Sequence, residues 1–226
     1  MPASWDQYAE RWSGLHGGVD PRRASVAVRA WSRLAYGLGR LLARLRVPPA
    51  AVTAAGAALS LLVPVAAGVG RPESAAVLVL LATLADALDG AVAIIADRVT
   101  RLGYVYDSVA DRLGEAAWLV ALWLLGGPFW LVVAAGAVTW LHEYVRARAT
   151  AAGMTDVGVV TVAERPTRAI VAILGLAAAG VATLVSHAFL TGTVTLAAIA
   201  WLLLAVIGLV QLIKAVHTGL AERSST

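Results

Sequence analysis

The sequence predicts an all-α integral membrane protein in which six transmembrane helices follow an N-terminal amphipathic juxtamembrane helix. Of its 226 residues, 60% are apolar and only 14% are charged, and the mean hydropathy is +0.78. Soluble domains are usually about 45–50% apolar. Six spans of about 20 residues take roughly 120 residues, which leaves short loops but no separate soluble domain.

The sequence contains no cysteine, which excludes several kinds of functional site. Without thiols the chain has no disulfide framework, no zinc–thiolate site, no iron–sulfur cluster and no thiol nucleophile. Metal binding and catalysis must therefore depend on oxygen and nitrogen groups.

Residues 1–21 form a polar N-terminal segment. It carries Asp6, Glu10 and Asp20 and has no apolar core of the length that a signal peptide needs, so we expect no cleaved targeting segment.

Residues 22–46 are predicted to form an amphipathic surface helix. At about 100° per residue, arginines gather on one side and apolar side chains on the opposite one. The arginine side holds Arg29, Arg33, Arg40 and Arg44, and the apolar side holds Trp31, Leu34, Leu38, Leu41, Leu42 and Leu45. Such a helix lies on a membrane, with its arginines facing anionic lipids, or else packs on a soluble partner.

Six apolar runs then follow, with edges set by proline, glycine and charge. They form a transmembrane domain over residues 47–215, and residues 216–226 are a cytoplasmic tail. The predicted spans are 49–69, 74–96, 103–125, 128–149, 167–187 and 192–213.

The distribution of basic residues predicts how the protein is oriented in the membrane. The links at 70–73, 126–128 and 187–191 hold only Arg71, and every other lysine or arginine lies in the N-terminal segment, in the opposite links or near the C-terminus. By the positive-inside rule that side is cytoplasmic, unless the bias arose by chance. The pI near 10 is then explained by topology and lipid contact, so we expect no nucleic-acid partner.

Ionisable residues interrupt three spans. A carboxylate at the bilayer centre costs roughly 2.5–3.5 kcal/mol, so four unneutralised aspartates would cost on the order of 10 kcal/mol. The interruptions are Asp86 and Asp89 in the second span, Asp107, Asp111, Arg112 and Glu115 in the third, and His142 and Glu143 in the fourth.

The aspartates share helix faces. Asp86 and Asp89 are three residues apart, and Asp107 and Asp111 are four apart, so each pair lies on one face of its helix. Four hard oxygen donors suit Mg²⁺ or Mn²⁺ better than zinc. Divalent ions at such a cluster support phosphoryl chemistry. A buried ion-pair network with arginines and a cation pathway in a transporter remain open on spacing alone.

These residues form a motif that resembles a known signature. Asp86-Ala-Leu-Asp89-Gly90-Ala-Val-Ala93, nine residues, and Gly103-Tyr-Val-Tyr-Asp107-Ser-Val-Ala-Asp111 resemble the DxxDGxxAR, eight residues, GxxxDxxxD signature of the CDP-alcohol phosphatidyltransferases. Members of that family are similar in having six transmembrane helices after an amphipathic surface helix, with a cytoplasmic active site. The resemblance therefore implies a multi-pass protein of the plasma membrane that works in phospholipid biosynthesis.

The resemblance also implies a reaction. The hydroxyl of a polar alcohol attacks the lipid-side phosphorus of CDP-diacylglycerol, and CMP leaves. Carried over, Asp86, Asp89 and Asp107 bind metal, while Asp111 serves as the base and as a ligand of a second ion, so that two Mg²⁺ or Mn²⁺ ions are expected. The donor-binding positions implied are Gly90, Ala93, Thr100 and, more weakly, Thr53, which could equally be a helix-start hydroxyl.

One signature position differs. The arginine that follows Ala93 in the family is Ile94 here, and the family residue resembles a clamp for the donor diphosphate. Arg98, about one helical turn further on, or Arg101 could supply that charge. A non-catalytic relative is the alternative.

A second block concerns the acceptor. Tyr144-Val-Arg146-Ala-Arg148-Ala and Glu164-Arg165-Pro166-Thr-Arg168 are similar to the YxKARA and ERPxR segments of actinobacterial phosphatidylinositol phosphate synthases. The resemblance implies that Arg146, Arg165 and Arg168 bind the phosphate of inositol phosphate, with Lys214 standing in for an arginine of the last span. Topology-setting arginines, and glycerol 3-phosphate, serine or another polyol as acceptor, remain open.

Three further points complete the prediction. The resemblance implies a homodimer. The rival class, a cation transporter, would need polar residues in the outer halves of the spans, which instead hold Ala, Leu and Val with Trp118, Trp123 and Trp130. His142 and Glu143 could border the acceptor site or pair with Arg112.

Overall fold

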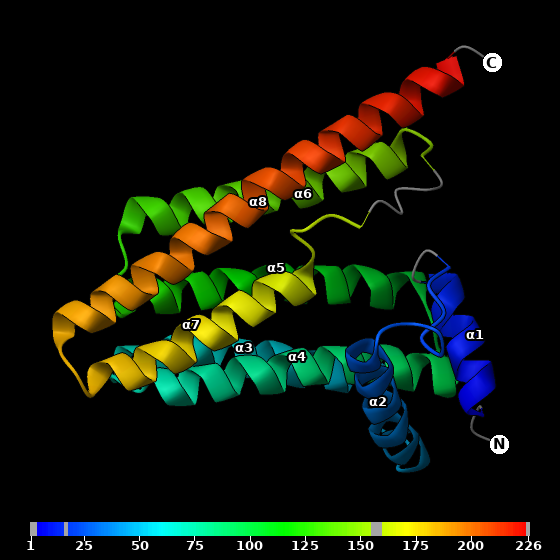
Figure 1. The fold of residues 1–226 in the computed structure, drawn as a ribbon. Coiled ribbons are helices and arrows are strands. Elements are labelled where there is room, and N and C mark those ends of the chain that lie inside the picture. Colours follow the sequence, from blue (N-terminus) through cyan, green and yellow to red (C-terminus); the bar gives the residue numbers. More distant parts are fainter. Residues whose placement is uncertain (1–3, 16–17, 155–159, 225–226) are drawn as a thin grey trace. The chain divides into compact units, whose positions relative to one another are not determined.

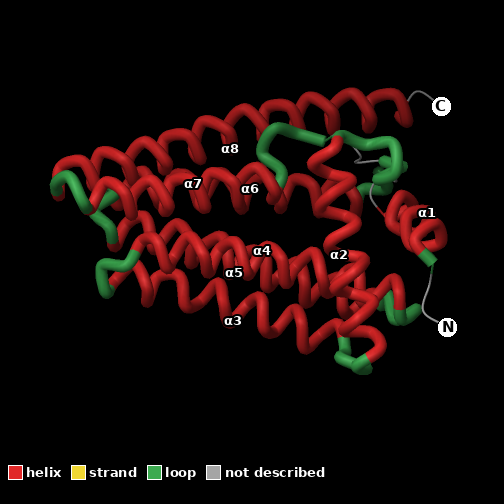
Figure 2. Tube along the Cα trace, turned by 60° about the horizontal axis from the view of Figure 1, so that its bottom comes forward, coloured by secondary structure: helices red, strands yellow, loops and turns green. Residues whose placement is uncertain are grey.

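The computed structural model describes residues 4–15, 18–154 and 160–224, and these residues form eight α-helices with no strand among them (Figures 1 and 2). The helices are α1 (Trp5–Leu15), α2 (Val26–Arg44), α3 (Pro49–Gly68), α4 (Pro72–Ile95), α5 (Arg101–Leu124), α6 (Phe129–Ala151), α7 (Arg165–Thr183) and α8 (His187–Ser224). The predicted all-α class is confirmed.

Four of these helices are long and apolar enough to cross a membrane, namely α3, α4, α7 and α8. The helices α5 and α6 match two further predicted spans in length, but charged residues lower their apolar character. The chain is therefore a multi-pass membrane protein.

Several features of the helices differ from the expected boundaries. Helix α2 begins at Val26 rather than at 22, and α8 begins at His187 rather than at 192. Helix α1 lies within the segment that we interpreted only as polar. Helix α8 continues to Ser224, although the predicted span ends at 213, because no proline stops it and its last turns contain good helix formers. Residues 225–226 of the predicted tail lie outside the described part.

The chain divides into two compact units. One comprises Met1–Leu59 and Leu81–Leu113, and the other comprises Ser60–Leu80 and Gly114–Thr226. Helices α3, α4 and α5 each contribute residues to both units.

The core of the first unit joins α1 and α2 to the end of α4. Its buried residues are Tyr8, Ala35, Ala91, Ile94 and Ile95, and Trp5 and Trp12 pack against them. Gly39 permits the close approach of α2, since a Cβ there would lie 2.9 Å from the Cβ of Ala91.

The connection from α4 to α5 is tightly built. Asp97 has φ +54°, a left-handed conformation that aspartate tolerates, and Arg98 N donates to Ala93 O at 2.8 Å, which closes the last turn of α4. Thr100 Oγ1 then accepts a hydrogen bond of 3.0 Å from Gly103 N. This short turn fixes α5 next to α4.

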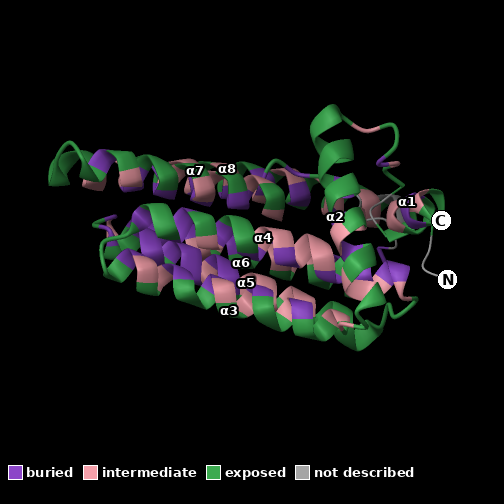
Figure 3. Ribbon diagram, turned by 90° about the horizontal axis from the view of Figure 1, so that it is seen from below, coloured by how far each residue is buried: buried purple, intermediate pink, exposed green. Residues whose placement is uncertain are grey.

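In the second unit, α8 packs against both α6 and α7. Buried and exposed positions alternate along these helices (Figure 3), and the largest buried apolar side chains are Trp118, Leu122, Leu176, Trp201 and Leu212. Trp201 Nε1 donates to Thr139 Oγ1 at 3.0 Å, so a buried polar group of the core is satisfied.

Candidate active site

Three of the four motif aspartates come together in the first unit. One carboxylate oxygen from each of Asp86, Asp89 and Asp107 lies within 4.8 Å of the others. Asp86 and Asp89 face the same way because they are three residues apart on α4, and the short turn to α5 brings Asp107 to them.

Helix α3 contributes a hydroxyl to this cluster. Thr53 Oγ1 donates to Asp89 Oδ2 at 2.6 Å and also lies 3.2 Å from Pro49 O. The contact to the carboxylate is the shorter of the two. Thr53, which the resemblance places near the donor, thus orients Asp89 in this structure.

The cluster has the donor set of a divalent-cation site. Its ligands are hard carboxylate oxygens, Asp89 is only 6% exposed, and Asp86 and Asp107 are half-buried. Three carboxylates brought this close in a partly buried place fit a divalent ion, whose charge offsets their mutual repulsion.

Asp111 lies one helical turn beyond Asp107 on α5, outside this group of three. Its side chain is 16% exposed, and its Oδ2 lies 3.8 Å from Arg112 Nη2. The carboxylate is therefore partly accessible and has a cation nearby.

The other predicted donor residues differ in their surroundings. Gly90 is exposed, and no atom lies within 4 Å of the place a Cβ would take, so space is available beside Asp89. Ala93 is half-buried and Arg98 is exposed. Thr100, also exposed, caps the start of α5 with its hydroxyl.

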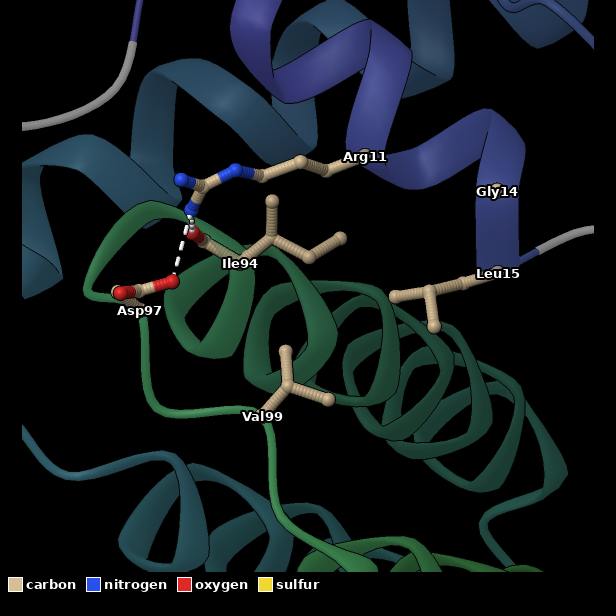
Figure 4. A pocket seen from close by; sticks show the side chains of 6 residues that line it. All are labelled: Arg11, Gly14, Leu15, Ile94, Asp97 and Val99. Atoms are coloured by element: carbon tan, nitrogen blue, oxygen red, sulfur yellow. Dashed lines mark hydrogen bonds and ion pairs between the residues drawn. The ribbon is translucent and has the colours of Figure 1, made fainter.

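Ile94, which departs from the signature, is 2% exposed in the core shared with α1 and α2. An arginine could not occupy this apolar position without burying its charge. Arg11 of α1 instead donates from Nη1 to Ile94 O at 3.2 Å and to Asp97 Oδ1 at 3.0 Å (Figure 4). These residues border a cavity of about 310 Å³ whose other walls are Gly14, Leu15 and Val99.

In the second unit, two of the predicted acceptor residues, Arg146 and Arg168, form ion pairs with glutamates. Arg168 Nε lies 2.8 Å from Glu115 Oε1, and Arg168 Nη2 donates to Glu143 Oε1 at 2.9 Å. Arg146 Nη2 donates to Glu164 Oε1 at 2.6 Å. The guanidinium of Arg165 lies 5.9 Å from the ring centroid of Trp118, within the range of a cation–π contact.

Two residues whose roles were open now have partners. His142 is fully buried, with Nε2 3.1 Å from Thr161 Oγ1, and Glu143 pairs with Arg168. Lys214 is exposed on α8.

Sequence reasoning missed Arg11, Thr161 and the role of Glu164. Glu164 stands in the ERPxR block directly before a helix with proline at its start, which is a recognisable helix-start signal. Arg11 gave no such signal, because only the packing of α1 brings it to the end of α4.

Residues 46–211 match the CDP-alcohol phosphatidyltransferase family. The chain is 32% identical over 197 residues to a phosphatidylinositol phosphate synthase of Mycolicibacterium smegmatis, covering 83% of this chain and 84% of that protein. It is 34% identical over 186 residues to a phosphatidylinositol phosphate synthase of Corynebacterium glutamicum, covering 74% and 75%.

The fold is similar to crystal structures of Mycobacterium tuberculosis phosphatidylinositol phosphate synthase. With CDP-DAG bound, that protein gives a TM-score of 0.64 at 26% identity over 80% of this chain and 94% of the other. In complex with manganese and citrate it gives 0.67 at 27% identity over 81% and 89%.

A manganese complex in a similar structure and three clustered aspartates in this one agree on the use of a divalent metal. The match covers most of the chain and includes the whole aspartate motif. The chain belongs to the CDP-alcohol phosphatidyltransferase family, and it is a phosphotransferase.

Proposed function

We propose that this protein transfers the phosphatidyl group of CDP-diacylglycerol to the hydroxyl of inositol phosphate and releases CMP. The observation that carries the proposal is the cluster of Asp86, Asp89 and Asp107 in a chain whose similar proteins are phosphatidylinositol phosphate synthases.

The aspartates have the following roles in this proposal. Asp86, Asp89 and Asp107 hold divalent metal, Mg²⁺ or Mn²⁺, and two ions bind when Asp111 also acts as a ligand. A bound divalent ion offsets the charge that develops on the donor phosphates. Thr53 keeps Asp89 oriented through its hydrogen bond.

The transfer itself is an exchange of two phosphorus–oxygen bonds. The acceptor oxygen forms a bond to the lipid-side phosphorus, the bond to CMP breaks, and Asp111 takes the proton of the acceptor hydroxyl. The space beside Gly90 and the half-buried Ala93 leave room for the nucleotide, and Thr100 and Arg98 adjoin it.

The acceptor is phosphorylated in this proposal because its proposed residues are cationic. Arg146, Arg165 and Arg168 bind its phosphate, with Lys214 contributing, and arginine suits this task through its planar fork of donors.

The membrane arrangement follows from the charge distribution. Six helices, α3 to α8, span the plasma membrane, with the active site on the cytoplasmic side and α2 lying on the membrane surface. Residues 47–215 make up the catalytic domain, and the protein works as a homodimer.

The test is the release of CMP by purified protein incubated with CDP-diacylglycerol and Mg²⁺. We expect release with inositol phosphate, and little with free inositol, glycerol 3-phosphate or serine. Release only with another acceptor would overturn the acceptor assignment, and no release with any acceptor would favour a non-catalytic relative.

A further inference from the structure

Two of the acceptor arginines are engaged with carboxylates. Arg168 contacts Glu115 and Glu143, and Arg146 lies 2.6 Å from Glu164 and 4.0 Å from Glu143. A phosphate that binds these arginines meets guanidinium groups that are already paired, so binding requires that an ion pair be exchanged.

The pair of Arg168 with Glu115 is not exchangeable. Their side chains are 2% and 1% exposed, and separating a buried pair leaves a charge in a low-dielectric surrounding without its partner. Arg168 also donates to Glu143, so its guanidinium links α5, α6 and α7. Arg168 therefore keeps its contact with Glu115 when it binds the phosphate in the proposed function.

The pair of Arg146 with Glu164 is different. The side chains are 25% and 28% exposed, so water and a small anion can reach both groups. A partly exposed ion pair contributes little to stability, which makes its exchange inexpensive.

Glu164 keeps other partners when Arg146 turns away. Its Oε1 also accepts hydrogen bonds of 3.0 Å from Thr161 N and from Thr161 Oγ1. Because that hydroxyl donates its only hydrogen to Glu164, it accepts from His142 Nε2, 3.1 Å away, and so is itself held in place. The carboxylate therefore stays hydrogen-bonded without the arginine.

We propose that Glu164 is a specificity-determining residue that occupies Arg146 in the free enzyme and gives it up only to a phosphate dianion. The inference rests on the proposed function, since it assumes that Arg146 receives the phosphate of the acceptor. A phosphate monoester can replace a carboxylate at a guanidinium with equal or greater charge, whereas a neutral hydroxyl cannot. The exchange favours phosphorylated acceptors over free polyols.

The experiment compares the KM for inositol phosphate in the wild type and in Glu164→Gln, using CMP release in the presence of CDP-diacylglycerol. The glutamine amide keeps an oxygen that accepts hydrogen bonds from Thr161, but it is uncharged and no longer competes with phosphate for Arg146. We expect KM to fall about two- to fivefold, because this is the change in affinity that corresponds to the free energy of a partly exposed ion pair. We expect kcat to stay nearly unchanged. Inorganic phosphate should inhibit the variant at correspondingly lower concentration.

A second variant, Thr161→Val, should change the KM in the opposite direction. It removes the hydroxyl that holds Glu164 after the exchange, so the carboxylate stays on Arg146 and KM for inositol phosphate rises. The matched control is Glu73→Gln, which alters an exposed carboxylate beside Arg71 and should leave KM unchanged.

An unchanged or higher KM in Glu164→Gln, or a lower KM in Thr161→Val, would overturn the inference. These outcomes differ from a failure of the proposed function, in which the wild type itself releases no CMP with inositol phosphate.

Discussion

Thr53 donates a hydrogen bond of 2.6 Å to Asp89, one of the three clustered carboxylates. A hydroxyl that orients a metal-binding carboxylate fixes both its direction and its basicity. In the proposed metal site, Thr53 therefore supports metal binding without being a ligand.

Replacing Thr53 by valine should weaken metal binding. The shape of the side chain is kept but the hydrogen bond is lost, and such changes typically cost about 10- to 100-fold in metal affinity. The measurement is the Mn²⁺ concentration that gives half-maximal CMP release. Thr53→Ser, which keeps the hydroxyl, should behave like the wild type, and an unchanged half-maximal concentration in Thr53→Val would contradict the assigned role.

Arg168 is the most deeply buried cation of the described network. The ERPxR block predicts Arg168 as an acceptor residue. Its partners Glu115 and Glu143 lie far away in the chain, on two other helices. Spacing along a single helix cannot reveal such contacts between helices. The aspartates could be predicted because each pair lies on a single helix face.

Substituting methionine for Arg168 should destabilise the protein by about 3–5 kcal/mol, because Glu115 is then left buried without a cation. Thermal unfolding in detergent would measure the loss. The double variant Glu115→Leu, Arg168→Met should recover most of the stability. A single variant as stable as the wild type would show that the pair does not hold the helices together.

Among the elements, α1 was the least predictable. Its composition is polar on average, and nothing in the chain before residue 16 indicates what it packs on. In the structure it buries Tyr8 against α2 and the end of α4. This packing also explains Ile94, since the position that carries arginine in the signature is here part of an apolar core.

Titration of Tyr8 should release α1. Burial raises the pKa of Tyr8 to about 12, above the value of about 10 in an unfolded chain. The protonated, folded form is thus favoured below pH 10, and this contribution is lost as the pH rises from about 10 to about 12.

Tryptophan fluorescence reports the release, because Trp5 and Trp12 pack on the same core. We expect a change between pH 10 and 12 in the wild type that is absent in Tyr8→Phe. A change of the same size and midpoint in both proteins would show that Tyr8 does not control the docking of α1.

For the whole molecule, helices α3 to α8 follow the order of the six predicted apolar runs, and four of these helices are long and apolar enough to cross a membrane. The apolar character of α5 and α6 is weaker because they carry ionisable side chains, Asp107 and Asp111 on one and His142 and Glu143 on the other. Composition alone therefore finds four candidate spans.

The metal-dependent mechanism is tested most directly by CMP release from CDP-diacylglycerol and inositol phosphate. Release is measured in the wild type with a chelator, in the wild type after Mg²⁺ or Mn²⁺ is restored, and in Asp89→Asn. We predict that the chelator abolishes release, that the divalent ion restores it, and that Asp89→Asn is at least about 100-fold slower, because the loss of a ligand removes several kcal/mol of charge stabilisation. Full activity in the chelator, or in Asp89→Asn, would contradict the metal-dependent mechanism.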